Sequence, residues 1–200
     1  MKTAFGALVS GLVLCVALAG CGASPPVRYF TLASEPLAAT SAREPAYSIA
    51  VGPVTVPDIV DRPHFVLRSS PNRVDIAEHA RWAAPLKHEI PRVIADHLAR
   101  LVKGAQTSTS AQRAAGSVDY RVLVDVQRFE STLNEGVTIQ AQWTVRARDG
   151  AALSGRTVAT EPAGAGYDDL VAAHSRALAT VSLEIADAIA KLRSAAPPPA

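Results

Sequence analysis

The sequence predicts an α+β domain: a single, mixed and mostly antiparallel sheet with two amphipathic helices packed on one of its faces. Apolar residues recur at helical spacing in two segments, at about 83–103 and from 167 onward. Between them, segments alternate apolar and polar residues with the period of two that buries one face of a strand. A chain of 200 residues without an evident internal repeat has room for one core, so one domain over 28–193 is expected.

The first half of this domain is expected to begin with strands. Aromatic and β-branched residues predict short strands at 28–32, 47–56, 64–69 and 73–77. Gly52-Pro53 interrupts the second of these, and because proline cannot donate to a ladder, a bulge or an edge position is expected there. The small, polar and proline-containing residues 33–46 predict a loop.

A helix is expected at about 83–103, where apolar residues share one stripe. Pro91 lies inside the pattern, so the helix either kinks there or begins near Ile90 after a short turn. Lys103-Gly104 closes it. Residues 105–117 are rich in Ser, Thr, Gln and Ala and predict a loop. The stripe consists of Leu86, Ile90, Ile94, Leu98 and Leu101.

A strand meander and a second helix complete the predicted domain. Strands are expected at 118–127, 137–147 and 153–160, with turns at Asn134-Glu135-Gly136 and Asp149-Gly150. The helix that begins near Tyr167 has an apolar stripe interrupted by His174. Residues 194–200 end in three prolines and an alanine and predict a disordered tail.

The N-terminus has the layout of a secretory signal over residues 1–20. Lys2 supplies a positive start, residues 4–20 carry no charge, and the run ends in Leu18-Ala19-Gly20-Cys21. That tetrapeptide resembles the lipobox of bacterial lipoproteins, which implies cleavage after Gly20 and a diacylglycerol on the sulfur of Cys21. Residues 21–27 would then be a lipidated N-terminus and short tether. An uncleaved membrane anchor, or a plain signal with a chance cysteine, are the alternatives.

Composition excludes several classes of function. The formal net charge of +2 is too small to indicate a nucleic-acid-binding protein. The chain has two cysteines; Cys15 leaves with the signal and Cys21 is expected to be lipidated. The mature domain is therefore expected to lack disulfides, thiolate metal sites and cysteine nucleophiles. We expect no cofactor other than the acyl chains.

Catalytic and metal-binding patterns are weak. His88-Glu89 lacks the second histidine of a zinc protease, because Arg92 stands in its place. The glycines of 164–166 precede two aspartates that would repel a phosphate, so they are interpreted as the start of a helix. No metal ligands or catalytic residues are predicted, and the protein is not expected to be an enzyme. The five histidines, interpreted as surface or core-edge residues, are His64, His79, His88, His97 and His174.

The stretch 79–86 is the most distinctive of the mature chain. Trp82 within it either packs as an aromatic anchor under the start of the helix or belongs to a partner-facing patch. Trp and Arg are both favoured at interface hot spots, which supports the second interpretation.

These and other stretches resemble the PqiC-type lipoproteins, the auxiliary lipoproteins of MCE-type ABC lipid-transport systems. The resemblance covers nearly the whole chain, except that 105–117 is longer and more polar than expected and that Pro91 lies within the first helix. The matching stretches are 28–32, 49–54, Val56-Pro57, Asp61-Arg62-Pro63, Arg68, Arg81-Trp82-Ala83, Pro85-Leu86 and 120–130.

The resemblance implies a non-enzymatic docking subunit, anchored in the outer membrane and facing the periplasm. Its partners would be an MCE-domain protein with its permease and ATPase, and its membrane contact the lipid on Cys21. Gly22, where retained lipoproteins often carry Asp, favours the outer membrane. Partner contacts are expected at Asp61, Arg62, Arg81 and Trp82. Whether the protein forms a homo-oligomer is left open by the resemblance.

Three other functions remain as alternatives. One is a lipid carrier with an apolar pocket between sheet and helices. Another is a lipoprotein of a different outer-membrane assembly machine. A periplasmic enzyme ranks last, because no nucleophile, base or metal cluster is evident in the sequence.

Overall fold

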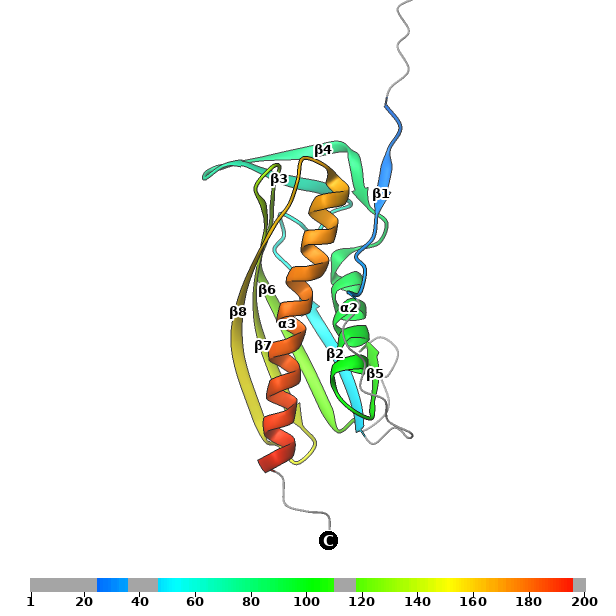
Figure 1. Ribbon diagram of the computed structural model, residues 1–200, viewed down its shortest axis with the longest axis vertical. Coiled ribbons are helices and arrows are strands. Elements are labelled where there is room, and N and C mark those ends of the chain that lie inside the picture. The colour runs from blue at the N-terminus through cyan, green and yellow to red at the C-terminus, as the bar shows by residue number, and fades with distance from the viewer. Residues whose placement is uncertain (1–24, 36–46, 110–117, 196–200) are drawn as a thin grey trace, which may run out of the picture.

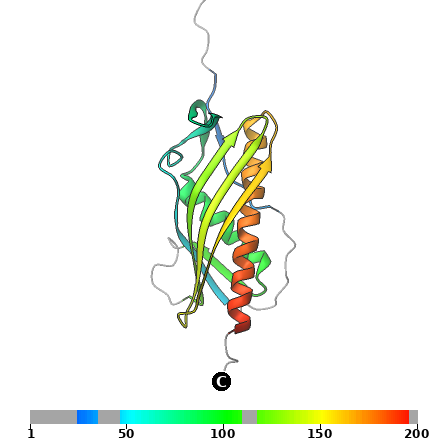
Figure 2. The ribbon, with the colours of Figure 1, turned by 90° about the vertical axis from the view of Figure 1, so that its left-hand side faces the viewer.

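A computed structural model describes residues 25–35, 47–109 and 118–195 of the chain. Within these ranges the predicted α+β class is confirmed, with both helices on one face of the larger of two sheets (Figure 1; Figure 2 looks toward the opposite face of that sheet). The elements are β1 (Arg28–Phe30), β2 (Tyr47–Thr55), β3 (His64–Ser70), β4 (Arg73–Trp82), α2 (Leu86–Leu101), β5 (Ala105–Thr109), β6 (Tyr120–Thr132), β7 (Gly136–Ala147), β8 (Ala152–Pro162) and α3 (Tyr167–Ala195).

The larger sheet has the strand order β5-β2-β6-β7-β8. The meander β6-β7-β8 is antiparallel, as the alternating pattern predicted, whereas β2 runs parallel to both of its neighbours. Apolar side chains of β6 and β7 alternate into the core, among them Val122, Val124, Ile139 and Val145. The helices cover this face, α3 over β7 and β8 and α2 over β2 and β5.

A second, smaller sheet was not predicted. It has the order β1-β4-β3, in which β1 pairs parallel with β4 and β4 pairs antiparallel with β3. β4 extends to Trp82, well beyond the expected end at 77, because β1 continues the pairing from Ala80 to Trp82. This sheet lies at the end of the molecule from which the described chain starts, at the top of Figure 1.

Two predicted boundaries are wrong in the first half of the chain. Residues 105–109, expected in a loop, form β5, because the free side of β2 offers a parallel partner from Tyr47 to Val51. α2 runs continuously from Leu86, so the alternative start near Ile90 is also wrong. The remaining loop residues, 110–117, lie outside the described ranges, as do 36–46 of the predicted linker.

The predicted irregularity at Gly52-Pro53 is a bulge. The pairing of β2 with β6 shifts register between Val51 and Val54, and the Gly52–Pro53 peptide bond is cis. The edge alternative is wrong, since β2 lies between β5 and β6.

The two chain ends are described only in part. Ser194 and Ala195 form the last turn of α3, and the rest of the predicted tail, 196–200, lies outside the described residues. The predicted signal and the lipobox cysteine also lie outside them. No helix among the described residues is long and apolar enough to cross a bilayer.

Two histidines lie in the core rather than at its edge or surface. His97 of α2 and His174 of α3 have no exposed surface. Nδ1 of His97 lies 3.0 Å from Oγ of Ser182 in α3, and Nε2 of His174 lies 2.8 Å from Oγ of Ser131 in β6. Each ring therefore links two elements through a hydrogen bond inside the apolar core, which sequence periodicity alone did not predict.

Candidate functional site

The candidate site is a cavity of about 440 Å³ next to the small sheet, which we call the Arg62 pocket. It lies where β1, the β2–β3 connection, the end of β4 and the start of α2 meet. Its lining residues are Tyr29, Asp61, Arg62, Pro63, Trp82, Ala83, Ala84, Pro85 and Lys87.

Backbone hydrogen bonds hold these segments together. The N–H of Trp82 donates to the carbonyl of Pro63 at 2.7 Å, and the N–H of Ala83 donates to the carbonyl of Phe30 at 2.7 Å. Within the β2–β3 connection, the N–H of Asp61 donates to the carbonyl of Pro57 at 3.1 Å, which closes a turn and sets the direction of the following residues. The pocket walls are thus fixed to both β1 and β4.

Trp82 forms part of the pocket wall from within the core. Its side chain is 5% exposed and stacks on Phe65, with ring centroids 4.2 Å apart. Phe129 meets it edge-on at 6.0 Å. The indole is therefore a packed aromatic anchor, and it reaches the pocket with only a small part of its surface.

The charges of the pocket are unevenly paired. Nζ of Lys87 lies 3.4 Å from a carboxylate oxygen of Asp61. The guanidinium of Arg62 has no ion pair within the described chain, and its buried Nε has no hydrogen-bond partner there. Arg62 is thus left as an unneutralised cation at the pocket wall.

The four predicted contact residues lie close together, but they do not play equal parts. Asp61, Arg62 and Trp82 line the pocket. Arg81 lies beside it on β4, in register with Tyr29 on β1 and with His64 on β3, and is half-buried. The fold therefore brings together, at the Arg62 pocket, the predicted contact residues of the segments 61–62 and 81–82.

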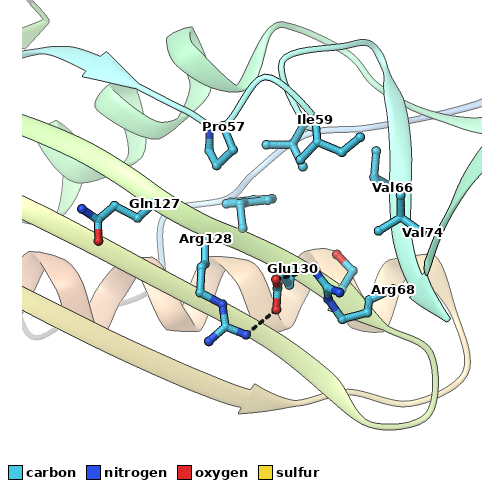
Figure 3. Close-up of a pocket in the computed structure, with 11 residues that line it drawn as sticks. Pro57, Ile59, Val66, Arg68, Val74, Gln127, Arg128 and Glu130 are labelled. Carbon is cyan, nitrogen blue, oxygen red and sulfur yellow. Dashed lines mark hydrogen bonds and ion pairs between the residues drawn. The ribbon is translucent and has the colours of Figure 1, made fainter. Parts of the chain in front are cut away.

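A second, smaller cavity of about 70 Å³ lies between the small sheet and β6 (Figure 3). Its polar rim is an ion-pair chain in which Glu130 lies 2.6 Å from Arg68 and 2.5 Å from Arg128. Burial alone would raise the pKa of Glu130, but hydrogen bonds from Arg128 and then Arg68 lower it below its ordinary value. Its apolar wall includes Ile59 and Val74, both more than one-third exposed. Sequence reasoning missed this cavity; the alternation of Val74 and Ile76 on the outer half of β4 was the available signal.

The two buried histidines have lowered pKa values. Burial lowers the pKa of His174 to about 3, and its ring stacks on Phe129 at 3.9 Å. Burial, together with the nearby charge of Arg100, lowers the pKa of His97 to about 4. Among the residues that the structure describes, no group of three His, Cys, Asp or Glu side chains could hold a metal ion.

Comparison with models of known protein families identifies the family of this chain. The model of the family described as "ABC-type transport auxiliary lipoprotein component" matches residues 30–186, from the end of β1 to well within α3. This chain belongs to that family. As the family's description says, such auxiliary lipoproteins are components of ABC-type transport. The two cavities described above lie almost entirely within the matched region.

Solved structures support the fold of the auxiliary lipoprotein. A crystal structure titled only as an uncharacterized protein shares 22% identity and a TM-score of 0.70, covering 82% of this chain and 99% of that one. Protein XCC0632 from Xanthomonas campestris, of family DUF330, shares 18% identity and a TM-score of 0.63, covering 84% of this chain and 98% of that one. At these identities the likeness concerns the fold alone. No curated protein matches the chain.

Proposed function

We propose that this auxiliary lipoprotein is a non-enzymatic docking subunit of an MCE-type ABC system that transports phospholipid, anchored in the outer membrane and facing the periplasm. The family match over residues 30–186 is the observation that carries the proposal. The Leu-Ala-Gly-Cys tetrapeptide at 18–21 supports the anchor, and Gly22 supports the outer membrane.

The anchor would act through the acyl chains of Cys21. One acyl chain holds a protein to a bilayer only marginally, at about 0.8 kcal/mol per buried CH₂, so two or three chains make a durable attachment. Replacing Cys21 by Ser is expected to abolish incorporation of labelled palmitate into the protein. Density-gradient separation of the two membranes locates the wild-type protein; recovery with the inner membrane would contradict the outer-membrane assignment.

Asp61, Arg62 and Arg81 are the proposed partner contacts, with Trp82 supporting them from the core. Asp61 is exposed and Arg81 is half-buried, so both present charge to a docking protein. Charged residues across an interface steer the encounter and select the partner. The backbone hydrogen bonds of Trp82 and Ala83 hold together the segments that carry these side chains.

In-cell photo-crosslinking tests the proposal. A crosslinking amino acid at Asp61 is expected to capture peptides of an MCE-domain protein or its permease. The matched control is Asp149, an exposed residue in the β7–β8 turn at the other end of the molecule, which should capture neither. Capture of an outer-membrane assembly machine would refute the transport role. Capture of no specific partner would favour the lipid-carrier alternative.

A further inference from the structure

The unneutralised Arg62 indicates that the pocket takes an anion. Buried polar groups in folded proteins are nearly always hydrogen-bonded. Nε of Arg62 is buried, yet neither a hydrogen bond nor an ion pair from the described chain reaches it. A planar guanidinium presents donors that match the oxygens of a carboxylate or a phosphate.

A second cation lies on the same wall. Lys87 stands in the first turn of α2, and its Nζ is 3.4 Å from Asp61, longer than a close charge-assisted bond. No side chain caps this end of α2, where the helix dipole adds positive potential to the two side chains. Asp61 is the one acidic residue of the lining, so the cations outnumber it.

The rest of the lining is apolar and aromatic. Trp82, Pro63 and Pro85 contribute carbon surface, and Tyr29 is 65% exposed at the rim. The volume of about 440 Å³ lies in the usual range for an organic ligand. A phosphate joined to an apolar body therefore fits this lining better than a free inorganic ion.

The position of the pocket is close to the lipidated end of the chain. Tyr29 follows Cys21 by eight residues, which span at most about 29 Å when extended. The small sheet, which includes β1, also forms the end of the molecule from which the described chain starts (Figure 1). A bilayer that holds Cys21 is thus within reach of the pocket.

We propose that the Arg62 pocket binds the phosphodiester headgroup of a phospholipid. Arg62 and Lys87 hold the phosphate oxygens, while Tyr29 and Trp82 contact the glycerol and the first methylene groups. This assignment rests on the proposed anchor and transport role, and it specifies the substrate contact of the docking subunit.

Binding is tested on the full-length lipidated protein in dodecyl maltoside micelles, which contain no phosphate. Dihexanoyl phosphatidylglycerol is titrated by calorimetry, with tryptophan fluorescence as a second signal because Trp82 lines the pocket. Saturable binding is expected, and Arg62→Gln should weaken it at least tenfold, since charge-assisted bonds are the stronger ones. The affinity of Arg62→Lys should lie between those of the wild type and Arg62→Gln. Asp61→Asn should strengthen binding several-fold, because it removes the acidic group and releases Lys87.

The matched control is Arg73→Gln, an exposed arginine of β4 outside the pocket, which should bind as the wild type does. Inorganic phosphate is the second arm and should bind at least a hundredfold more weakly than the lipid. Equal affinity for inorganic phosphate would overturn the headgroup assignment. Absence of saturable lipid binding, or equal binding by the wild type and Arg62→Gln, would overturn the site itself. Crosslinking from Asp61 to an MCE-domain protein is scored independently, so the docking role can stand if the lipid site fails.

Discussion

Lowering the pH from 7.5 to 5.5 is expected to destabilise the protein through its two core histidines. Nδ1–H of His97 donates to Ser182, whose own hydroxyl donates to the carbonyl of Leu178. Nε2 of His97 accepts the N–H of Glu35 at 2.9 Å. The folded state therefore holds the neutral ring, and a proton on Nε2 would oppose that N–H.

The size of the effect follows from the difference in pKa between the two states. The pKa values of His97 and His174 are lowered to about 4 and about 3, whereas an unfolded histidine titrates near 6.5. The unfolded chain thus binds more protons in this window, and stability falls as the pH falls. Each ring costs about 1.4 kcal/mol between pH 7.5 and 5.5, and the pair about 2.7 kcal/mol.

Urea denaturation of the wild type and of His97→Gln at both pH values measures this loss. In the variant, the pH-dependent loss of unfolding free energy should fall to about 1.4 kcal/mol, since only His174 still contributes. His79→Gln is the control, because His79 is exposed on β4 and its replacement should leave the full loss. If His97→Gln kept the wild-type pH dependence, the assignment of a neutral, buried ring at position 97 would be refuted.

Three substitutions test the packing. Trp82→Ala should lower the free energy of unfolding by about 3–5 kcal/mol, because it removes the ring stacked on Phe65; an unchanged urea midpoint would show that the indole is not core. Gly155→Ala should cost about 1–3 kcal/mol by thermal melting, since a Cβ there would lie 2.3 Å from the ring of Trp143, and a wild-type Tm would contradict this close approach. Asp119→Ala should cost a similar amount in urea, because it removes the acceptor of the backbone N–H of Ser48 in β2; equal stability would mean that water replaces the carboxylate.

Elements with a strong internal pattern could be predicted from the sequence. The apolar stripe of α3 and the alternation along β6 and β7 carry their period within one segment. β5 could not be predicted in this way. Its residues, Ala-Gln-Thr-Ser-Thr, alternate weakly, and their strand conformation comes from pairing with β2. Local sequence does not contain that partner.

The candidate site was predictable as a set of residues and unpredictable as a set of interactions. Charged and aromatic side chains at 61, 62 and 82 could be nominated from their types. Whether an arginine meets a carboxylate depends on the fold. Arg68 pairs with Glu130, which is 62 residues later in the sequence, whereas Arg62 meets no carboxylate in the described structure. The core position of Trp82 likewise depends on Phe65 of β3, which no spacing rule connects to it.

The parallel pairing of β2 has a consequence for the order in which the chain can fold. This strand lies inside the larger sheet, and one of its two neighbours is β6. The hydroxyl of Ser48 in β2 donates a hydrogen bond to Asp119, which follows it by 71 residues. Contacts of such sequence separation form late, because a long loop must close before they contribute. The larger sheet therefore cannot form around β2 until β6 is available for pairing. If the chain is exported as proposed, this delay means that the larger sheet closes only after β6 has crossed the membrane.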